Sequence, residues 1–333
     1  RLLALASLGA DAGFDFLLSS DHFHPWSLQQ GQSGLSWAWL GAAMSATGLG
    51  AGVVCAPGQR WHPAIVAQAA ATLAQMFPGK FWIALGSGQL LNEGITGDAW
   101  PPKAIRRQRL MECVEIIRAL WAGRTVTHRG LVRVEEATLF TLPPSLPMMY
   151  AAALSADTAR WAASWADGLI TVSGPDMLSV INAFREGGGG EKPIILKVQL
   201  SYAPDMDQAL EGAVDQWRAP TLDGSVQTML RRPEQFDAAV LPPRPLADEA
   251  GVIDAHDRHG PQVLRPAFGH IVAEPVALLH EVAAPAAREH LLFVLGRALQ
   301  KLEIDQGIGE AFVAVFQKAP VGPGAHDKMG WFL

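Results

Sequence analysis

The sequence predicts an α/β protein whose parallel strands close into a TIM-type (β/α)8 barrel. Apolar runs of strand length alternate with helical patterns at least six times, and single-helix crossovers favour a parallel sheet. The 333 residues are 49% hydrophobic, and no linker divides them into comparable halves, so we expect one domain over residues 1–333. No Gly-x-Gly-x-x-Gly fingerprint opens a helix after a strand, which argues against the alternative, a doubly wound open sheet.

In the first half of the chain, each predicted strand is followed by a loop and a helix. A helix over 1–12 ends at the stop signal Gly13, and no strand precedes it. We therefore expect the first strand of the barrel to be missing from this chain. The elements that follow are strand 14–18, helix 35–47, strand 49–56, helix 63–77, strand 81–85 and helix 103–121.

The second half continues the alternation after a polar β-hairpin insertion near 125–140. The predicted elements are strand 148–153, helix 156–165, strand 169–172, helix 177–185, strand 193–202, helix 206–217, strand 269–273, helix 276–282, strand 291–295 and helix 309–316. An irregular insertion lies near 219–266, and we expect the tail after Ala319 to be frayed. Seven strands are clear, and the missing leader would complete eight.

Charge and cysteine content exclude several classes of protein. The formal charge of −6 comes without a basic cluster, which argues against a nucleic-acid partner or an anionic membrane surface. Cys55 and Cys113 lack a second ligand at metal-binding spacing, and the Asp/His cluster at 254–259 is typical of a solvated loop, so we expect no metal. No signal peptide or long apolar run occurs, so we expect a soluble, cytoplasmic protein.

The most informative stretch is 20–26, directly after the first predicted strand. Asp21, His22 and Trp26 would lie at the carboxyl end of that strand, where α/β proteins carry out their chemistry. A histidine with an ordinary pKa of about 6.5 can take a proton from a hydroxyl near neutral pH. A loop-packing histidine and a core tryptophan are the alternative interpretations. Ser87 and Gly88 follow a later strand, where glycine lets a backbone approach a ligand closely.

Several linked motifs occur in one order along the chain. They are Ser-Asp-His-Phe-x-Pro-Trp at 20–26, Arg-Trp-His-Pro-Ala at 60–64, Phe-Pro-Gly-Lys-Phe at 77–81, Gly-Ser-Gly at 86–88, Asn-Glu at 92–93 and Trp-Pro at 100–101. With them the chain resembles the luciferase-like monooxygenase superfamily, and most closely its branch of coenzyme F420-dependent glucose-6-phosphate dehydrogenases. The resemblance is dense over 13–121 and thin beyond 217. It implies the barrel fold and a flavin-type cofactor, FMN or coenzyme F420.

The resemblance also implies roles around the reacting atoms. Asp21 matches an acid near the reactive ring of the cofactor, and His22 matches the histidine proposed to take the proton from a substrate hydroxyl. Trp26 matches the indole that lines the substrate side. Val53 and Val54 match a bulge where the family often has a non-proline cis peptide against the ring face.

The rest of the implied cofactor site comes from two loops. Ser87 and Asn92 match positions that hold the polar edge of the ring, and Gly88 lies between them. A turn at the N-terminus of a helix would receive the cofactor phosphate, because its free N–H groups favour an anion. That turn is formed by Ala152, Ala153, Leu154 and Ser155.

Three departures from the family pattern bear on function. Gln89 stands where the sugar-phosphate dehydrogenases carry a glutamate proposed as acid, and an amide cannot donate a proton in that way. No Lys occurs at 173–178 to clamp a sugar phosphate, so glucose 6-phosphate is not the expected substrate. Leu154 and Ser155 replace the usual glycines of the phosphate turn, which leaves the choice between FMN and F420 as cofactor open.

The first hypothesis is therefore an oxidoreductase that moves a hydride to or from a small organic substrate, with His22 as base. One alternative is an FMN-dependent monooxygenase that uses reduced flavin and oxygen and depends on a flavin reductase as partner. Another is a non-catalytic flavin-binding protein, which Gln89 and the altered phosphate turn favour. The resemblance further suggests a homodimer.

Overall fold

A computed structural model describes residues 2–203, 219, 222–240, 270–273, 310–318 and 328–332, with side chains for 2–197, 219 and 222–240. The helices are α1 (Leu2–Ala12), α2 (Ser36–Thr47), α3 (Pro63–Met76), α4 (Leu90–Glu93), α5 (Lys103–Trp121), α6 (Ala156–Ala162), α7 (Met177–Phe184), α9 (Gly224–Gln227) and α10 (Pro233–Ala239). The strands are β1 (Phe16–Ser20), β2 (Gly50–Cys55), β3 (Phe81–Leu85), β4 (Val126–Arg129), β5 (Arg133–Ala137), β6 (Met148–Ala152), β7 (Gly168–Val172), β8 (Ile194–Ala203), β9 (His270–Ala273), β10 (Glu310–Lys318) and β11 (Lys328–Phe332).

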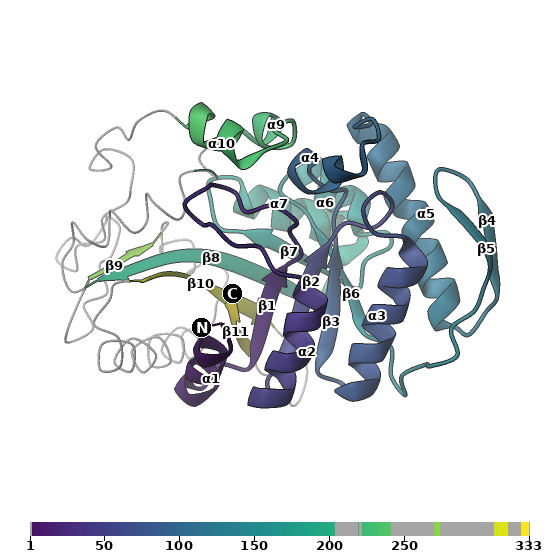
Figure 1. Cartoon of the computed structure of the whole chain (residues 1–333), viewed down its shortest axis with the longest axis horizontal. Coiled ribbons are helices and arrows are strands. Elements are labelled where there is room, and N and C mark those ends of the chain that lie inside the picture. Colours follow the sequence, from purple (N-terminus) through teal and green to yellow (C-terminus); the bar gives the residue numbers. More distant parts are fainter. Residues whose placement is uncertain are drawn as a thin grey trace.

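The main sheet has the strand order β10-β11-β1-β2-β3-β6-β7-β8-β9, and β10 also pairs with β8. In this order, each strand of the series β1, β2, β3, β6, β7 and β8 runs parallel to the next, and β11 is parallel to β1. Strand β10 is antiparallel to both of its neighbours, β11 and β8. The sheet therefore closes on itself, with helices α2, α3 and α5 on its outside (Figure 1). The predicted α/β barrel class is confirmed.

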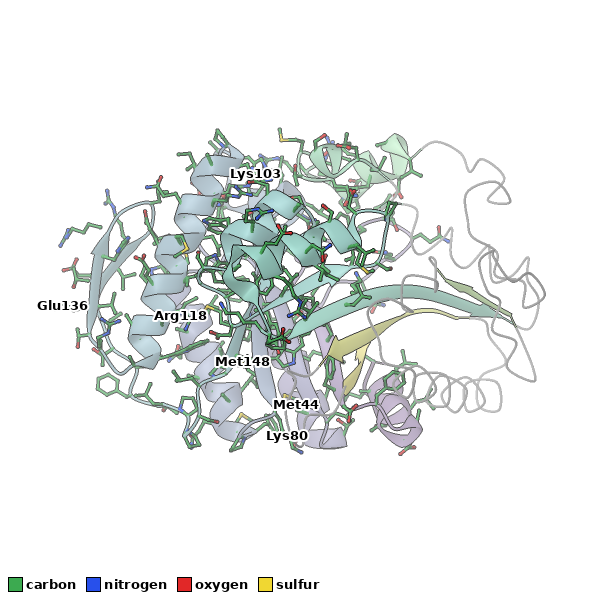
Figure 2. All side chains as sticks on the ribbon, turned by 180° about the vertical axis from the view of Figure 1, so that it is seen from behind. Met44, Lys80, Lys103, Arg118, Glu136 and Met148 are labelled. Atoms are coloured by element: carbon green, nitrogen blue, oxygen red, sulfur yellow. The ribbon has the colours of Figure 1, made fainter. Side chains whose placement is uncertain are left out.

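The outer core lies between the strands and the surrounding helices. Every residue of β3 is buried, as expected for a parallel strand covered on both faces. The hairpin of β4 and β5 forms a separate two-stranded sheet beside α5, and Figure 2 shows Glu136 on it, away from the barrel. None of the described helices is both long and apolar enough to cross a bilayer.

On most of the strands that line the barrel interior with rings, the inward side chains become smaller toward the carboxyl ends. Near the other end, Trp82 packs edge-on against Phe16 and Tyr150, with ring centroids 5.9 and 5.0 Å away. A Cβ on Gly52 would lie 2.1 Å from the Trp82 ring, so only glycine fits there. On β1, β3 and β6 the next inward residue toward the carboxyl end is smaller: Leu18 follows Phe16, Ala84 follows Trp82 and Ala152 follows Tyr150. On β2 the order is reversed, since Val54 follows Gly52.

Two expectations for the C-terminal region are wrong. The segment predicted as helix 309–316 is strand β10, which pairs on one side with β8 and on the other with β11. The tail after Ala319, expected to be frayed, contains β11, which pairs with β1 and β10. In both places long-range strand pairing determines the structure, and a local pattern does not report it.

Several predicted segments lie outside the described residues: helices 206–217 and 276–282, strand 291–295 and the Asp/His cluster at 254–259. The insertion near 219–266 is described over 222–240, where it forms α9 and α10. Lys103, at the start of α5, lies on the side of the molecule where α9 and α10 lie (Figure 2). Lys80 and Met148, at the beginnings of strands, lie on the opposite side. The segment 222–240 is therefore at the carboxyl end of the barrel.

Candidate active site

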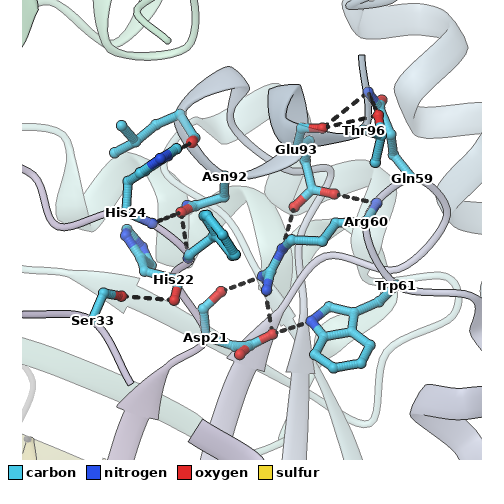
Figure 3. A network of polar contacts seen from close by, with 12 residues as sticks. Asp21, His22, His24, Ser33, Gln59, Arg60, Trp61, Asn92, Glu93 and Thr96 are labelled. Atoms are coloured by element: carbon cyan, nitrogen blue, oxygen red, sulfur yellow. Dashed lines mark hydrogen bonds and ion pairs between the residues drawn. The ribbon is translucent and has the colours of Figure 1, made fainter. Parts of the chain in front are cut away.

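Three loops that follow β1, β2 and β3 meet at the carboxyl end of the barrel (Figure 3). Asp21 comes directly after β1, and its backbone N–H donates to the carbonyl of Val54 in β2, at 2.8 Å. Arg60 lies in the loop after β2, and Glu93 ends α4 after β3. Because parallel strands bring their carboxyl ends to one edge, residues far apart in sequence become neighbours here.

Arg60 contacts acidic residues on both of the other loops. Its Nη2 donates to the Asp21 carbonyl at 2.6 Å and to Asp21 Oδ2 at 3.0 Å. Its backbone N–H donates to Glu93 Oε2 at 2.8 Å, and its Nε lies 3.7 Å from Glu93 Oε1. The side chains of Arg60, Asp21 and Glu93 are only 9%, 1% and 2% exposed, so this is a buried charge network that water screens poorly.

The Asp21 carboxylate has one further hydrogen-bond donor and one oxygen without a partner. The indole N–H of Trp61 also donates to Oδ2. Among the described residues, Oδ1 of the same carboxylate is buried and has no hydrogen-bond partner. An unpaired buried oxygen calls for an explanation, and a ligand donor is one. Burial raises the pKa of Glu93, which the Arg60 backbone and guanidinium oppose.

The loop that carries His22 is held in place by Asn92. The side-chain oxygen of Asn92 accepts from the backbone N–H groups of Phe23 and His24, at 2.9 and 3.4 Å. His24 Nδ1 lies 2.8 Å from the Leu91 carbonyl, which ties the same two loops together. Asn92 is thus a support of the loop as this structure has it, whereas the resemblance gave it to the cofactor ring. His24 is a structural residue of this loop, because its ring contacts the Leu91 carbonyl.

His22 is a neutral histidine at this edge. Its pKa is lowered to about 4, mainly by burial and in addition by the cations of Lys197 and Arg60, against a backbone hydrogen bond with His24 that raises it. Its ring centroid lies 5.2 Å from that of Trp26, at a tilt of 50°. A neutral imidazole at pH 7 can accept a proton, which is the state that a general base needs.

The third predicted residue, Trp26, is covered by the insertion. The ring of Phe236 in α10 packs edge-on against Trp26 with centroids 5.2 Å apart. Phe236 is completely buried and forms a small apolar cluster with Leu91 and Ala219. Asp21, His22 and Trp26 are therefore brought together, with Phe236 added from a segment more than two hundred positions away.

Gln89 and Gly88 lie in the loop between β3 and α4. Gln89 directly precedes the first turn of α4 and has an extended backbone conformation. The side chains of Gln89 and Ser87 are both half-buried. Gly88 has a φ of +83°, and a Cβ there would lie 2.9 Å from the Cγ of Glu93. The glycine is thus required by its backbone conformation and by the contact that a Cβ would make with Glu93.

The expected bulge at Val53 and Val54 is not present. Both valines lie in β2, with continuous register to β1 and to β3, and none of the described peptide bonds is cis. The ladder on both sides pairs each residue with one partner, so no extra residue is accommodated. Val53 faces the outer core and Val54 faces the barrel interior.

The predicted phosphate turn joins β6 to α6. Ala152 ends the strand, Ala153 is buried, and Leu154 is 61% exposed. Ser155 precedes the helix in extended conformation, but its hydroxyl contacts Thr158 at 2.9 Å, so no side chain caps the first turn.

Two cations from α5 lie beside this turn. Arg107 donates to Asp157 at 2.6 Å, and Lys103 lies 3.9 Å from the same carboxylate. Asp157 is 74% exposed, and the hydrogen bond and charge of Arg107 lower its pKa. Uncapped N–H groups with adjacent cations suit a phosphate.

A flavin-type group fits the residues at this edge of the barrel. The inward side chains of Ala84 and Ala152 are small, Asp21 offers an unpaired oxygen, and the first turn of α6 lacks a side-chain cap. A metal site has no support in the described part of the chain, which contains no group of three or more suitable His, Cys, Asp or Glu side chains.

Sequence reasoning gave no role to Arg60, Glu93, Lys197 or Phe236. The first two stand in quoted motifs, and a charged pair within a linked set of motifs is a signal that could have been used. Lys197 lies in a strand and Phe236 in the irregular insertion, and neither has a local pattern that points to the site.

The chain is similar in sequence to several characterised dehydrogenases. The chain is 33% identical over 290 residues to an F420-dependent glucose-6-phosphate dehydrogenase of Beutenbergia cavernae, covering 81% of this chain and 86% of that protein. It is 34% identical to an F420-dependent hydroxymycolic acid dehydrogenase of Mycobacterium tuberculosis, over 66% of this chain and 63% of that one.

A solved structure is also similar. An F420-dependent secondary alcohol dehydrogenase in complex with an F420-acetone adduct superposes with a TM-score of 0.65 at 30% identity, covering 72% of this chain and 76% of the other. The family described as luciferase-like monooxygenase matches residues 1–276. With that match and these relatives, the chain belongs to the luciferase-like monooxygenase family.

Proposed function

We propose that this protein is an oxidoreductase that transfers a hydride between a small organic alcohol and coenzyme F420 or FMN, with His22 as the base. The observation that carries the proposal is the position of His22 at the carboxyl end of the barrel, with its ring 5.2 Å from that of Trp26 and next to the buried Arg60–Asp21 pair. The relatives named as F420-dependent dehydrogenases support the class of reaction and favour F420.

The residues divide the work as follows. The bound cofactor supplies the hydride acceptor. His22 takes the proton from the substrate hydroxyl, since its ring is unprotonated at neutral pH. Trp26 and Phe236 exclude water from one side. Arg60 fixes the backbone at Asp21, one residue before the base.

Asp21 and the turn before α6 are the groups that would hold the cofactor. The unpaired Oδ1 of Asp21 can accept a hydrogen bond from a polar edge of the ring. The N–H groups at the start of α6 would receive its phosphate, with Arg107 close by. Gln89 can hydrogen-bond in this pocket but cannot act as an acid, so the reaction relies on His22 for proton transfer.

The test is a comparison of His22→Ala with wild type. We expect turnover with an alcohol to fall by about 10² to 10⁴-fold, the usual contribution of a positioned base, with cofactor affinity nearly unchanged. His24→Ala is the matched control, since it perturbs the same loop through the contact with Leu91 and leaves the base in place. Equal losses of cofactor affinity and turnover in His22→Ala would mark His22 as scaffold.

The runner-up is an FMN-dependent monooxygenase, for which the altered phosphate turn with its exposed Leu154, which leaves FMN open as the cofactor, is the favouring observation. This alternative predicts oxygen uptake with externally reduced FMN. It also predicts no reduction of the cofactor by an alcohol in the absence of oxygen.

A further inference from the structure

Lys197 lies on the inner side of β8. Ile195, two positions earlier, belongs to the inner cluster of the barrel, whereas Ile194 and Leu196 belong to the outer core. Successive side chains of a strand point to opposite faces, so Lys197 shares the inner face with Ile195. The lysine thus places a cation in the barrel interior, where bulky apolar side chains are the usual filling.

Lys197 is at the carboxyl end of that interior. The parallel register pairs it with Val172, the last residue of the neighbouring strand β7 (Figure 1). Val172 is on the same inner face as Ile170, yet it is 36% exposed. Ala152, which ends β6, and Lys197 itself are also partly exposed. The interior is therefore open to solvent at this level, and the Lys197 side chain is accessible to a ligand.

The charge of Lys197 acts on the proposed base. His22 follows β1, which β11 and β10 separate from β8 around the closed sheet. After burial, the ammonium of Lys197 does most to lower the pKa of His22, ahead of the guanidinium of Arg60. Arg60 is already paired with two carboxylates of the protein, those of Asp21 and Glu93. Lys197 is therefore the better placed of these two cations to receive an anion beside His22.

A single ammonium favours a carboxylate over a phosphate. Its three N–H donors allow it to bind a ligand oxygen in addition to a group of the protein. A phosphate monoester carries about −1.5 to −2 charges and three acceptor oxygens, which call for further cations. Residues 173–178, directly after β7, contain no Lys or Arg and include the acidic Asp176. A monoanion is thus the ligand that this side of the barrel can neutralise.

We infer that Lys197 binds the substrate, and that the substrate is a hydroxy acid whose carboxylate pairs with this ammonium while its hydroxyl faces His22. This inference rests on the proposed hydride transfer. The C–H bond of the carbinol carbon breaks with its electron pair going to the oxidised cofactor, and the hydroxyl proton goes to His22. The hydroxy acid is oxidised to an oxo acid and the cofactor is reduced.

The first experiment varies only the charge of the substrate. The full chain is loaded with F420, or with FMN if only that binds, and kcat/KM is measured for 2-hydroxybutanoate, 3-hydroxybutanoate, their methyl esters and glucose 6-phosphate. We expect the better of the two acids to exceed its own ester by about 10-fold or more, because the ester has the same carbinol carbon and lacks the charged partner of Lys197. An ester that equals its acid, or a preference for glucose 6-phosphate, overturns the inference.

Lys197→Met tests the residue itself. We expect KM for the preferred acid to rise by about 10 to 100-fold, the usual worth of one hydrogen bond to a charged group, with KM for its ester unchanged. Lys197→Arg retains the charge and should recover part of the loss. Lys192→Met is the matched control, since Lys192 lies just before β8, at the other end of the strand, where its Nζ donates to the Ala163 carbonyl at 2.8 Å. This control should keep the preference for the acid.

A binding measurement separates Lys197 from catalysis. In calorimetry, 2-oxobutanoate is titrated into protein that holds the oxidised cofactor, a pair that cannot react. Its affinity should fall in Lys197→Met by about 10 to 100-fold while the affinity for the cofactor stays unchanged. Loss of cofactor affinity with unchanged oxo acid affinity would assign the ammonium to the cofactor and overturn the inference. Failure of acids and esters alike to reduce the cofactor in wild type refutes the proposed function instead, and the titration then still decides whether Lys197 binds a carboxylate.

Discussion

Replacing Arg60 with alanine is the perturbation whose size the structure defines best. The guanidinium is 9% exposed and faces two carboxylates that are 1% and 2% exposed, those of Asp21 and Glu93. Removing one member of a buried ion pair usually costs about 3 to 5 kcal/mol, because the remaining charge stays buried without compensation. Here two like charges remain, so we expect a loss of about 4 kcal/mol of unfolding free energy, measured from urea unfolding at pH 7.

Two comparisons make this prediction sharp. Arg129→Ala removes an ion pair with Glu135 that is 74% and 62% exposed, and should change the unfolding free energy by no more than about 1 kcal/mol. Combining Arg60→Ala with Asp21→Asn and Glu93→Gln should recover part of the loss, because the unpaired charges are removed. A loss below about 1 kcal/mol in Arg60→Ala would show that the network is not a buried ion pair.

The remaining predictions concern backbone strain, pH and thiol reactivity. Gly88→Ala should destabilise the protein more than Gly97→Ala does in thermal unfolding. Both glycines have φ near +80°, a conformation that costs a residue with a Cβ about 1 to 2 kcal/mol, but only at Gly88 would the Cβ meet another side chain. Equal losses would remove the steric part of this reasoning. Stability should fall as pH drops from 6.5 toward 4, because the unfolded chain protonates His22 and the folded one does not. The full difference is about 3 kcal/mol, and it should be absent in His22→Gln. Burial raises the thiol pKa of Cys55, and that of Cys113 to about 12, so a disulfide reagent at pH 8 should label neither in the native protein and both in urea.

Much of the barrel could be predicted because its local signals agree. The strands and helices up to Ala162 fall close to the predicted ranges, since buried parallel strands are apolar runs and their helices follow at short distance. At 309–316 this kind of signal is ambiguous. A run of small and branched apolar residues fits a helix or a strand, and β10 is decided by its two neighbours in the sheet.

The candidate site was predictable only in part. Asp21, His22 and Trp26 follow from their place after β1, and the linked motifs supported them. Arg60 contacts Asp21 across 39 positions and Glu93 across 33. Such contacts depend on strand order, which no local pattern contains.

Local signals also did not reveal the regular backbone of β2 or the packing of Phe236 on Trp26. Val53 and Val54 were assigned by resemblance, which carries residue types but not dihedral angles, and β2 is regular there. Phe236 lies in a segment without periodicity, and its partner Trp26 is 210 positions away (236 minus 26). The contact between Phe236 and Trp26 is therefore seen only in the three-dimensional structure.

The most direct test of hydride transfer is isotopic. The protein is mixed without oxygen with its oxidised cofactor and a secondary alcohol carrying deuterium on the carbinol carbon. We predict that the cofactor is bleached more slowly than with the unlabelled alcohol, that the deuterium is recovered on the cofactor when this is F420, which accepts a hydride on carbon, and that His22→Ala slows bleaching by about 10² to 10⁴-fold. Bleaching that requires oxygen, bleaching at the same rate with both alcohols, or release of the deuterium to water when F420 is the cofactor would contradict hydride transfer at this site.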